Sequence, residues 1–238
     1  MKKTAVILGC AAVGATLCLS GKPAFAGNLV LNGGFDNFDL TEGKRGDKTN
    51  WNYFDGEYLD SQKSELGWQV TTSGTLEVRR NGVAGKSHNG SSHFAELDAH
   101  KYNGAVAADE DLGIFQDIVT KVGKKYRLEF SYAARPNIDG DRNQFETLFG
   151  DVFSQQFDGG NGKTGEGKSW KTFSTEVVAD SDMTRLQFNY LGRRDTLGAH
   201  VDSVSVTEVP EPASLLGLAF VGLCGVGSVA KRKKLAVA

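Results

Sequence analysis

The chain has 238 residues, with 27 basic and 29 acidic side chains and three cysteines. The cysteines, Cys10, Cys18 and Cys224, all lie in apolar segments near the two ends, so the long central stretch can form no disulfide and no thiolate metal site. That stretch, residues 27–209, holds 20 of the basic and 28 of the acidic residues, a net charge of −8. A net negative charge argues against nucleic acid as a partner, because nucleic-acid binding requires a basic surface.

Residues 1–26 have the three parts of a secretory signal peptide. Lys2 and Lys3 precede an almost wholly apolar run to Leu19, and Ala24-Phe25-Ala26 places small residues at the positions that a signal peptidase reads. The alternative, an uncleaved membrane anchor, is disfavoured because the apolar run is short for a bilayer span. We therefore expect export and cleavage after Ala26.

The other end of the chain has a second signal, at residues 209–234. Pro210-Glu211-Pro212 precedes an apolar run, 213–230, that is just long enough to cross a bilayer as a helix, and four basic residues follow at 231–234. This arrangement resembles the PEP-CTERM sorting signal of Gram-negative bacteria that make exopolysaccharide. The resemblance implies an inner-membrane precursor, a sorting protease of the exosortase type as partner, and a final place at the cell surface or outside the cell. A plain tail anchor is the alternative.

The segment 27–208 is predicted to be one all-β domain. Apolar side chains alternate along many short runs, turn sequences rich in Asn, Asp and Gly separate the runs, and no convincing amphipathic helix appears. This pattern favours a two-sheet jelly-roll sandwich with polar loops at 36–65 and 158–169. The expected strands, in chain order, are 29–31, 67–71, 75–80, 93–98, 113–119, 126–132, 145–153, 173–177, 186–190 and 204–206.

Five pieces of this domain resemble, in order, the group of DUF642 domains and carbohydrate-binding modules. They are Asn28–Asp36, Gly67–Val70, a central hairpin made of Glu96–Asp98, Ile114–Asp117 and Gly123–Phe130, then Ser131–Pro136, and the closing Val201–Val206. The resemblance implies a galactose-binding-like jelly roll that binds polysaccharide without catalysis. The sequence departs from the group in having Asp36 where Glu is common, and it lacks the cysteines of the plant members.

Four aromatic residues crowd into a stretch without strand alternation and are candidates for glycan binding. They are Trp51, Tyr53, Phe54 and Tyr58, and exposed rings suit this role because the apolar face of a pyranose stacks on a ring. The alternative is that they fold back to cap the sandwich. Tyr102 and Arg135, on a predicted loop and a strand end, are weaker ligand candidates.

Asp202 is expected to point inward, because it shares strand parity with Val204 and Val206. A buried carboxylate needs compensation. In calcium-binding members of the jelly-roll group, acids at the positions of Asp36 and Asp202 help to hold one ion, so the resemblance implies a structural Ca²⁺. The alternative is that loop amides donate hydrogen bonds to Asp202 and no metal binds.

Two other functions remain open. A hydrolase or lyase acting on glycans would need two carboxylates facing each other across a cleft. A structural matrix protein that binds other proteins would need a large flat apolar patch.

Overall fold

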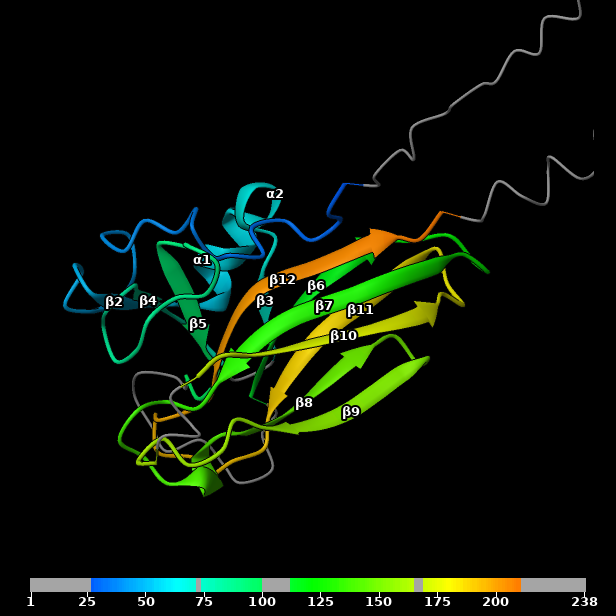
Figure 1. Ribbon diagram of the computed structural model, residues 1–238. Helices are drawn as coiled ribbons and strands as arrows, with labels where there is room; N and C mark the ends of the chain where they lie inside the picture. Colours follow the sequence, from blue (N-terminus) through cyan, green and yellow to red (C-terminus); the bar gives the residue numbers. More distant parts are fainter. Residues whose placement is uncertain (1–26, 72–73, 100–111, 165–168, 211–238) are drawn as a thin grey trace, which may run out of the picture.

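The computed structural model describes residues 27–71, 74–99, 112–164 and 169–210. Two antiparallel sheets pack face to face in these residues (Figure 1). The chain crosses between the sheets repeatedly, as in β5 to β6, β7 to β8 and β11 to β12. The predicted all-β sandwich is therefore confirmed.

The larger sheet has seven strands in the order β1-β2-β4-β5-β12-β7-β10. Its strands are β1 (Arg45–Gly46), β2 (Trp51–Phe54), β4 (Leu76–Arg80), β5 (His93–Glu96), β12 (His200–Glu208), β7 (Lys125–Ala133) and β10 (Lys171–Val178).

The smaller sheet has five strands in the order β3-β6-β11-β8-β9. Its strands are β3 (Gln69–Val70), β6 (Gly113–Val119), β11 (Met183–Tyr190), β8 (Gln144–Phe149) and β9 (Phe153–Asp158). The single strand expected at 145–153 is wrong, because the chain turns after Phe149 and forms the β8–β9 hairpin.

The segment 36–65, expected to be a loop, contains regular structure. It holds β1, β2 and two short helices, α1 (Gly56–Ser61) and α2 (Lys63–Leu66). Asp55 caps α1 by accepting a hydrogen bond from the Tyr58 amide. A further 3₁₀ turn, η1, spans Gly140–Arg142. These helices are too short to show the apolar periodicity by which a helix is recognised in a sequence.

The opening segment 29–31, expected to be a strand, forms none. Leu29 donates one backbone hydrogen bond to Val206 on β12, and the chain then enters a run of turns in which Asn32 and Phe35 have positive φ. Phe35 nevertheless reaches the core, where its ring stacks on Trp68 at 5.1 Å.

The core between the sheets is strongly aromatic. Phe130 on β7 contacts Phe145, Phe157 and Phe188 of the smaller sheet, with ring centroids 5.1–6.3 Å apart. Trp68 is fully buried, and its indole N–H donates to the Asn32 carbonyl. Stability therefore comes from packing between the sheets, as the lack of cysteines in this segment requires.

The two ends of the domain leave from the same end of the sandwich (Figure 1). In the part of the chain that the structure describes, no helix is both long and apolar enough to cross a membrane. The predicted signal peptide 1–26, residues Glu211 and Pro212 of the sorting motif and the predicted span 213–230 lie outside the described residues; Pro210 is exposed.

Candidate functional site on the larger sheet

Trp51 and Tyr53 lie side by side on the outer face of the larger sheet. On β2, Asn52 and Phe54 point inward and are fully buried, so the two residues that alternate with them point away from the core. Their rings meet edge to face with centroids 5.2 Å apart, and both are half-buried. The aromatic residues expected in a loop are thus divided by a strand into an outer pair and an inner residue.

Charged residues of the two neighbouring strands continue this surface. Arg79 and Glu77 on β4 pair with Trp51 and Tyr53 in register, and Glu96 on β5 pairs with Glu77. The Arg79 guanidinium lies 5.6 Å from the centre of the Trp51 ring and joins the two carboxylates, at 2.5 Å from Glu77 Oε1 and 2.5 Å from Glu96 Oε2. We call these five residues, with Arg135, the outer-face site.

The two carboxylates have opposite electrostatic environments. Burial, and then the charge of Glu96, raise the pKa of Glu77 above its usual range. Burial also acts to raise the pKa of Glu96, but hydrogen bonding to His200 and the charges of Arg79 and Arg135 outweigh it and lower that pKa. Glu77 therefore holds a proton more readily than an ordinary glutamate does, and Glu96 less readily.

Arg135 and His200 complete the surroundings of Glu96. Arg135 forms an ion pair with Glu96 Oε1, and His200 Nε2 lies 3.4 Å from Glu96 Oε2. The Arg135 side chain is 16% exposed, whereas the Glu77 and Glu96 side chains have no exposure. Of the charged groups, Arg135 is therefore the best placed to meet a ligand from solution.

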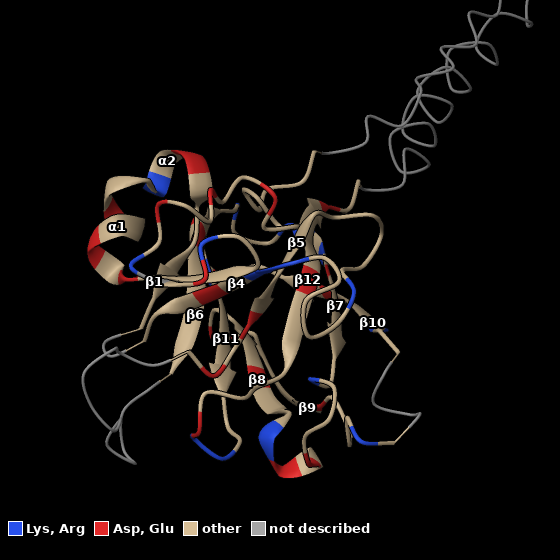
Figure 2. Ribbon diagram, turned by 90° about the vertical axis from the view of Figure 1, so that its left-hand side faces the viewer, with Lys and Arg blue, Asp and Glu red and all other residues tan. Residues whose placement is uncertain are grey.

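The loop between β4 and β5 covers part of this face. Trp170 donates its indole N–H to the Lys86 carbonyl of that loop, and its ring packs edge-on against Phe94 on β5. The covered part lies over β5 and β12, while Trp51 and Tyr53 stand at the other side, on β2. Figure 2 shows acidic and basic residues on the strands around the labels β4 and β12.

One of the predicted glycan ligands, Tyr58, does not join the site. Tyr58 lies on α1 and packs its ring against Phe54, 5.2 Å away, on the core side of β2. It therefore caps the core, as the alternative interpretation held. Tyr102 lies outside the described residues.

Asp36 and Asp202 flank one segment of the β4–β5 loop. Asp202 accepts hydrogen bonds from the His88 amide at 2.7 Å and from its own neighbour Ser203, and Asp36 accepts from the amides of Ser92 and His93. The pairing register shifts between Asp202 and Ser205, and Ser203 has a positive φ. Because of this bulge, the expected parity is wrong. Val201 and Val204 face the core, and Asp202 is buried beneath the loop instead.

The oxygen atoms around Asp36 and Asp202 suit a hard cation as ligands, but they are few. Both Asp side chains offer oxygen, and burial raises the pKa of Asp202 to about 6 despite hydrogen bonds from His88, Ser203 and Ser91 that lower it. A cation would offset this cost of burial. Within the described ranges, no three Asp, Glu, His or Cys side chains gather closely enough to hold a metal, so other ligands would have to be carbonyl or hydroxyl oxygens.

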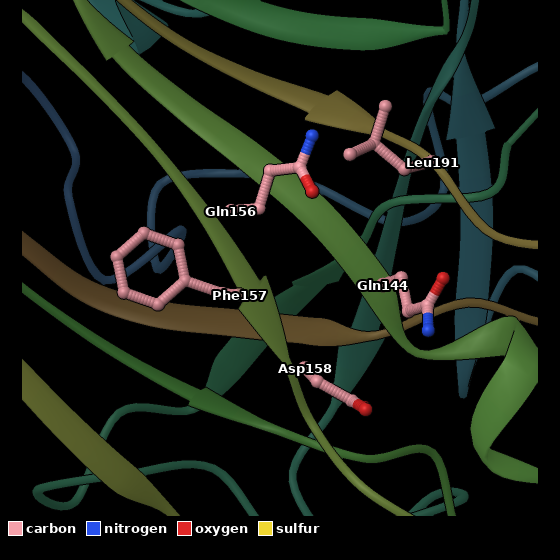
Figure 3. A pocket seen from close by; sticks show the side chains of 5 residues that line it. All are labelled: Gln144, Gln156, Phe157, Asp158 and Leu191. Carbon is pink, nitrogen blue, oxygen red and sulfur yellow. The ribbon is translucent and has the colours of Figure 1, made fainter.

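A separate hollow of about 200 Å³ lies at the edge of the smaller sheet. Figure 3 shows its lining residues, from β8, β9 and the end of β11: Gln144, Gln156, Phe157, Asp158 and Leu191. It contains none of the predicted site residues. Its amide side chains offer hydrogen bonds, but it has no ring face open for stacking, since Phe157 is buried.

No protein-family model matches the chain, and no curated protein matches it. Solved structures with a similar fold include a carbohydrate-binding module, CBM4, at 15% identity, covering 76% of this chain and 99% of that one with a TM-score of 0.41. Another is a CBM61 module in complex with β-1,4-galactotriose, at 12% identity, covering 77% and 100% of the two chains with a TM-score of 0.43. These TM-scores are low, so the likeness assigns no family to the chain.

Proposed function

We propose that the domain binds polysaccharide without catalysis, at the outer-face site. The observation that carries this proposal is the Trp51–Tyr53 pair, two half-buried rings fixed on a strand beside a guanidinium. Ring faces held on a rigid sheet offer a platform on which the apolar face of a sugar can stack.

The charged residues hold this platform in place. The Arg79 guanidinium packs near the Trp51 ring, and Glu77 interacts with the Tyr53 hydroxyl, which contributes with burial to raising the pKa of Tyr53. Rings that are fixed before binding lose little conformational entropy on binding. The partly exposed Arg135 is then available to donate hydrogen bonds to sugar hydroxyls.

One observation favours catalysis, the second candidate function. Glu77 and Glu96 have pKa values shifted in opposite directions, as the acid and base of a glycosidase do. Both side chains are fully buried, however, and share one guanidinium instead of facing each other across a cleft. We therefore propose a structural role for the pair.

Replacing Trp51 by alanine is expected to weaken polysaccharide binding about five- to thirtyfold, because loss of one stacking ring costs on the order of 1–2 kcal/mol. The melting temperature should change little, since the ring is half-buried on the outer face. Affinity electrophoresis against a panel of polysaccharides measures the binding. Tyr58→Ala is the matched control that should keep binding. Unchanged binding by Trp51→Ala would contradict the proposed site, and steady release of reducing ends by the parent would support the enzyme instead.

We further propose that the protein is exported and is held in the inner membrane by residues 213–230 until an exosortase-type protease releases it. Support comes from the order of motif, apolar run and basic cluster in the sequence. The position of Pro210, exposed just after the end of β12, would leave the motif accessible to a protease.

Replacing Pro210, Glu211 and Pro212 together by alanine is therefore expected to leave uncut precursor in the inner membrane of a host that has the sorting protease. Cell fractionation with mass measurement checks this. A replacement at Glu208 serves as a control that keeps the motif. Mutant and parent of identical mass and location would show that the motif is not read.

We also propose a structural Ca²⁺ between Asp36 and Asp202. The ion would neutralise the buried Asp202 and link the start of the domain to its last strand. Calcium at millimolar concentration is then expected to raise the melting temperature, because an ion that binds only the folded state stabilises it. Superimposable melting curves with calcium and with chelator would contradict this site, whereas Asp202→Asn should remove the calcium effect.

The metal-free protein has its own pH dependence. Because the pKa of Asp202 is raised when folded, the folded state keeps a proton that the unfolded state loses from about pH 4 upward. The free energy of unfolding should therefore fall, by up to about 3 kcal/mol, as pH rises to about 6, and then level off. Urea denaturation between pH 4 and 7 in chelator measures this fall, and calcium should reduce it.

A further inference from the structure

Four large apolar side chains are exposed at one end of the sandwich. Val119 is 71% exposed, Val122 61%, Met183 59% and Val178 50%. Single exposed apolar residues are common on protein surfaces, so what matters is whether these four belong to one surface.

Hydrogen bonds place the four residues at the same end of the sandwich, Val119 and Met183 on the smaller sheet and Val122 and Val178 beside the larger one. Met183 on β11 pairs directly with Val119 on β6. The turn that carries Val122 is joined to the end of β10 by two backbone bonds, Gly123 N to Ala179 O and Ala179 N to Lys124 O. The residues therefore surround the β6–β7 and β10–β11 turns, and we call them the end patch.

The chain leaves the domain beside this patch. Val209, just after β12, donates a backbone hydrogen bond of 2.8 Å to Lys125, which follows the Val122 turn. Figure 1 shows that β12 and β10 both run toward this end of the sandwich. Three residues separate Val209 from the start of the apolar run at Ala213, so the Cα atoms of Val209 and Ala213 lie at most about 14 Å apart.

We infer that the end patch rests on the surface of the lipid bilayer that holds residues 213–230. The inference rests on the proposed membrane-held precursor. So short a connection turns this end of the sandwich toward the bilayer, and apolar side chains gain free energy at its interface. Lys121 lies in the same turn and is exposed, so its long side chain can reach anionic headgroups.

This contact gives the precursor a fixed orientation. The turn between β8 and β9 and the turn η1 then lie at different distances from the bilayer. The outer-face site lies on the side of the sandwich rather than at the membrane. A glycan could then bind while the protein is still anchored, and cleavage near Pro210 would free both the domain and the patch.

The test uses the full chain reconstituted into vesicles of phosphatidylethanolamine and phosphatidylglycerol. Cys10, Cys18 and Cys224 are replaced by alanine, and one new cysteine carries an environment-sensitive fluorophore, in Val122→Cys or, as the control at the far end, in Asp141→Cys. Resistance to alkaline carbonate extraction first establishes that the chain is inserted. Extraction of the chain would refute the anchoring proposal itself.

For inserted chain, we expect the label at position 122 to shift its emission to the blue and to be quenched by nitroxide-bearing lipids, with neither change at position 141. Adding Val178→Ser and Met183→Ser should abolish the shift without releasing the chain, which separates docking from mere tethering. Labels at 122 and 141 that behave alike overturn the inference. A shift that persists after these two replacements also overturns the inference. The same holds if the chain shows the shift in detergent, where self-association of the chain and not the bilayer would cause it.

Discussion

Replacing Arg79 by methionine is expected to lower the free energy of unfolding by about 3–5 kcal/mol, because the change leaves two buried carboxylates without their common partner. The Arg79 side chain contacts both Glu77 and Glu96 at 2.5 Å, and neither carboxylate has access to water. Urea denaturation at pH 7 measures the loss. Glycan binding should fall as well, since Trp51 loses the neighbouring guanidinium.

Two comparisons isolate the cause. Arg185→Met breaks a partly exposed pair with Asp117 and should cost no more than about 1 kcal/mol. Adding Glu77→Gln and Glu96→Gln to Arg79→Met should recover part of the stability, because the buried charge is then removed. A loss from Arg79→Met as small as that from Arg185→Met would show that the ionic cluster is not a structural centre of the larger sheet.

Replacing Trp68 by alanine should also cost about 3–5 kcal/mol, because it removes the largest fully buried side chain of the core. The ring stacks on Phe35, lies 6.2 Å from Phe188 and donates to the Asn32 carbonyl, so the opening segment should loosen with it. Chemical denaturation and hydrogen exchange of residues 29–38 report the two effects. Trp51→Ala serves as the comparison; equal losses from both replacements would contradict the assignment of one tryptophan to the core and the other to the surface.

The strands of the middle of the domain could be predicted from the sequence because each alternates cleanly. The range 113–119 agrees with β6, and Tyr126, Leu128 and Phe130 face the core as their parity indicates. The helices and β2 could not be predicted, because four to six residues give no readable period and tertiary contacts decide their conformation.

The candidate site could be predicted only in part. The sequence pointed to Trp51 and Tyr53 by their chemistry, but it gave no reason to place them on β2 rather than in a loop. Glu77, Arg79 and Glu96 were missed. One signal was present: in Leu76-Glu77-Val78-Arg79 the charges alternate with apolar residues, which puts both charges on one face of a strand. What faces them depends on which strands pair, and no local pattern contains that information.

The position of Asp202 shows a different limit of structure prediction from the sequence. Parity along 202–206 predicts that its side chain points the same way as Val204, but a bulge at Ser203 breaks the alternation. The one mark of the bulge in the sequence is that Val201 and Val204 are three residues apart instead of two. The prediction that this carboxylate is buried was nevertheless correct, and the amides of His88 and Ser203 donate hydrogen bonds to it.

The most direct test of glycan binding at the outer-face site uses the three tryptophans of the chain, Trp51, Trp68 and Trp170. Protein labelled with 5-fluorotryptophan should give one fluorine resonance for each, assigned by single Trp→Phe replacements. Titration with a polysaccharide that the protein binds should move the Trp51 resonance and leave that of the buried Trp68 in place. Saturable binding that leaves the Trp51 resonance unmoved would contradict the account.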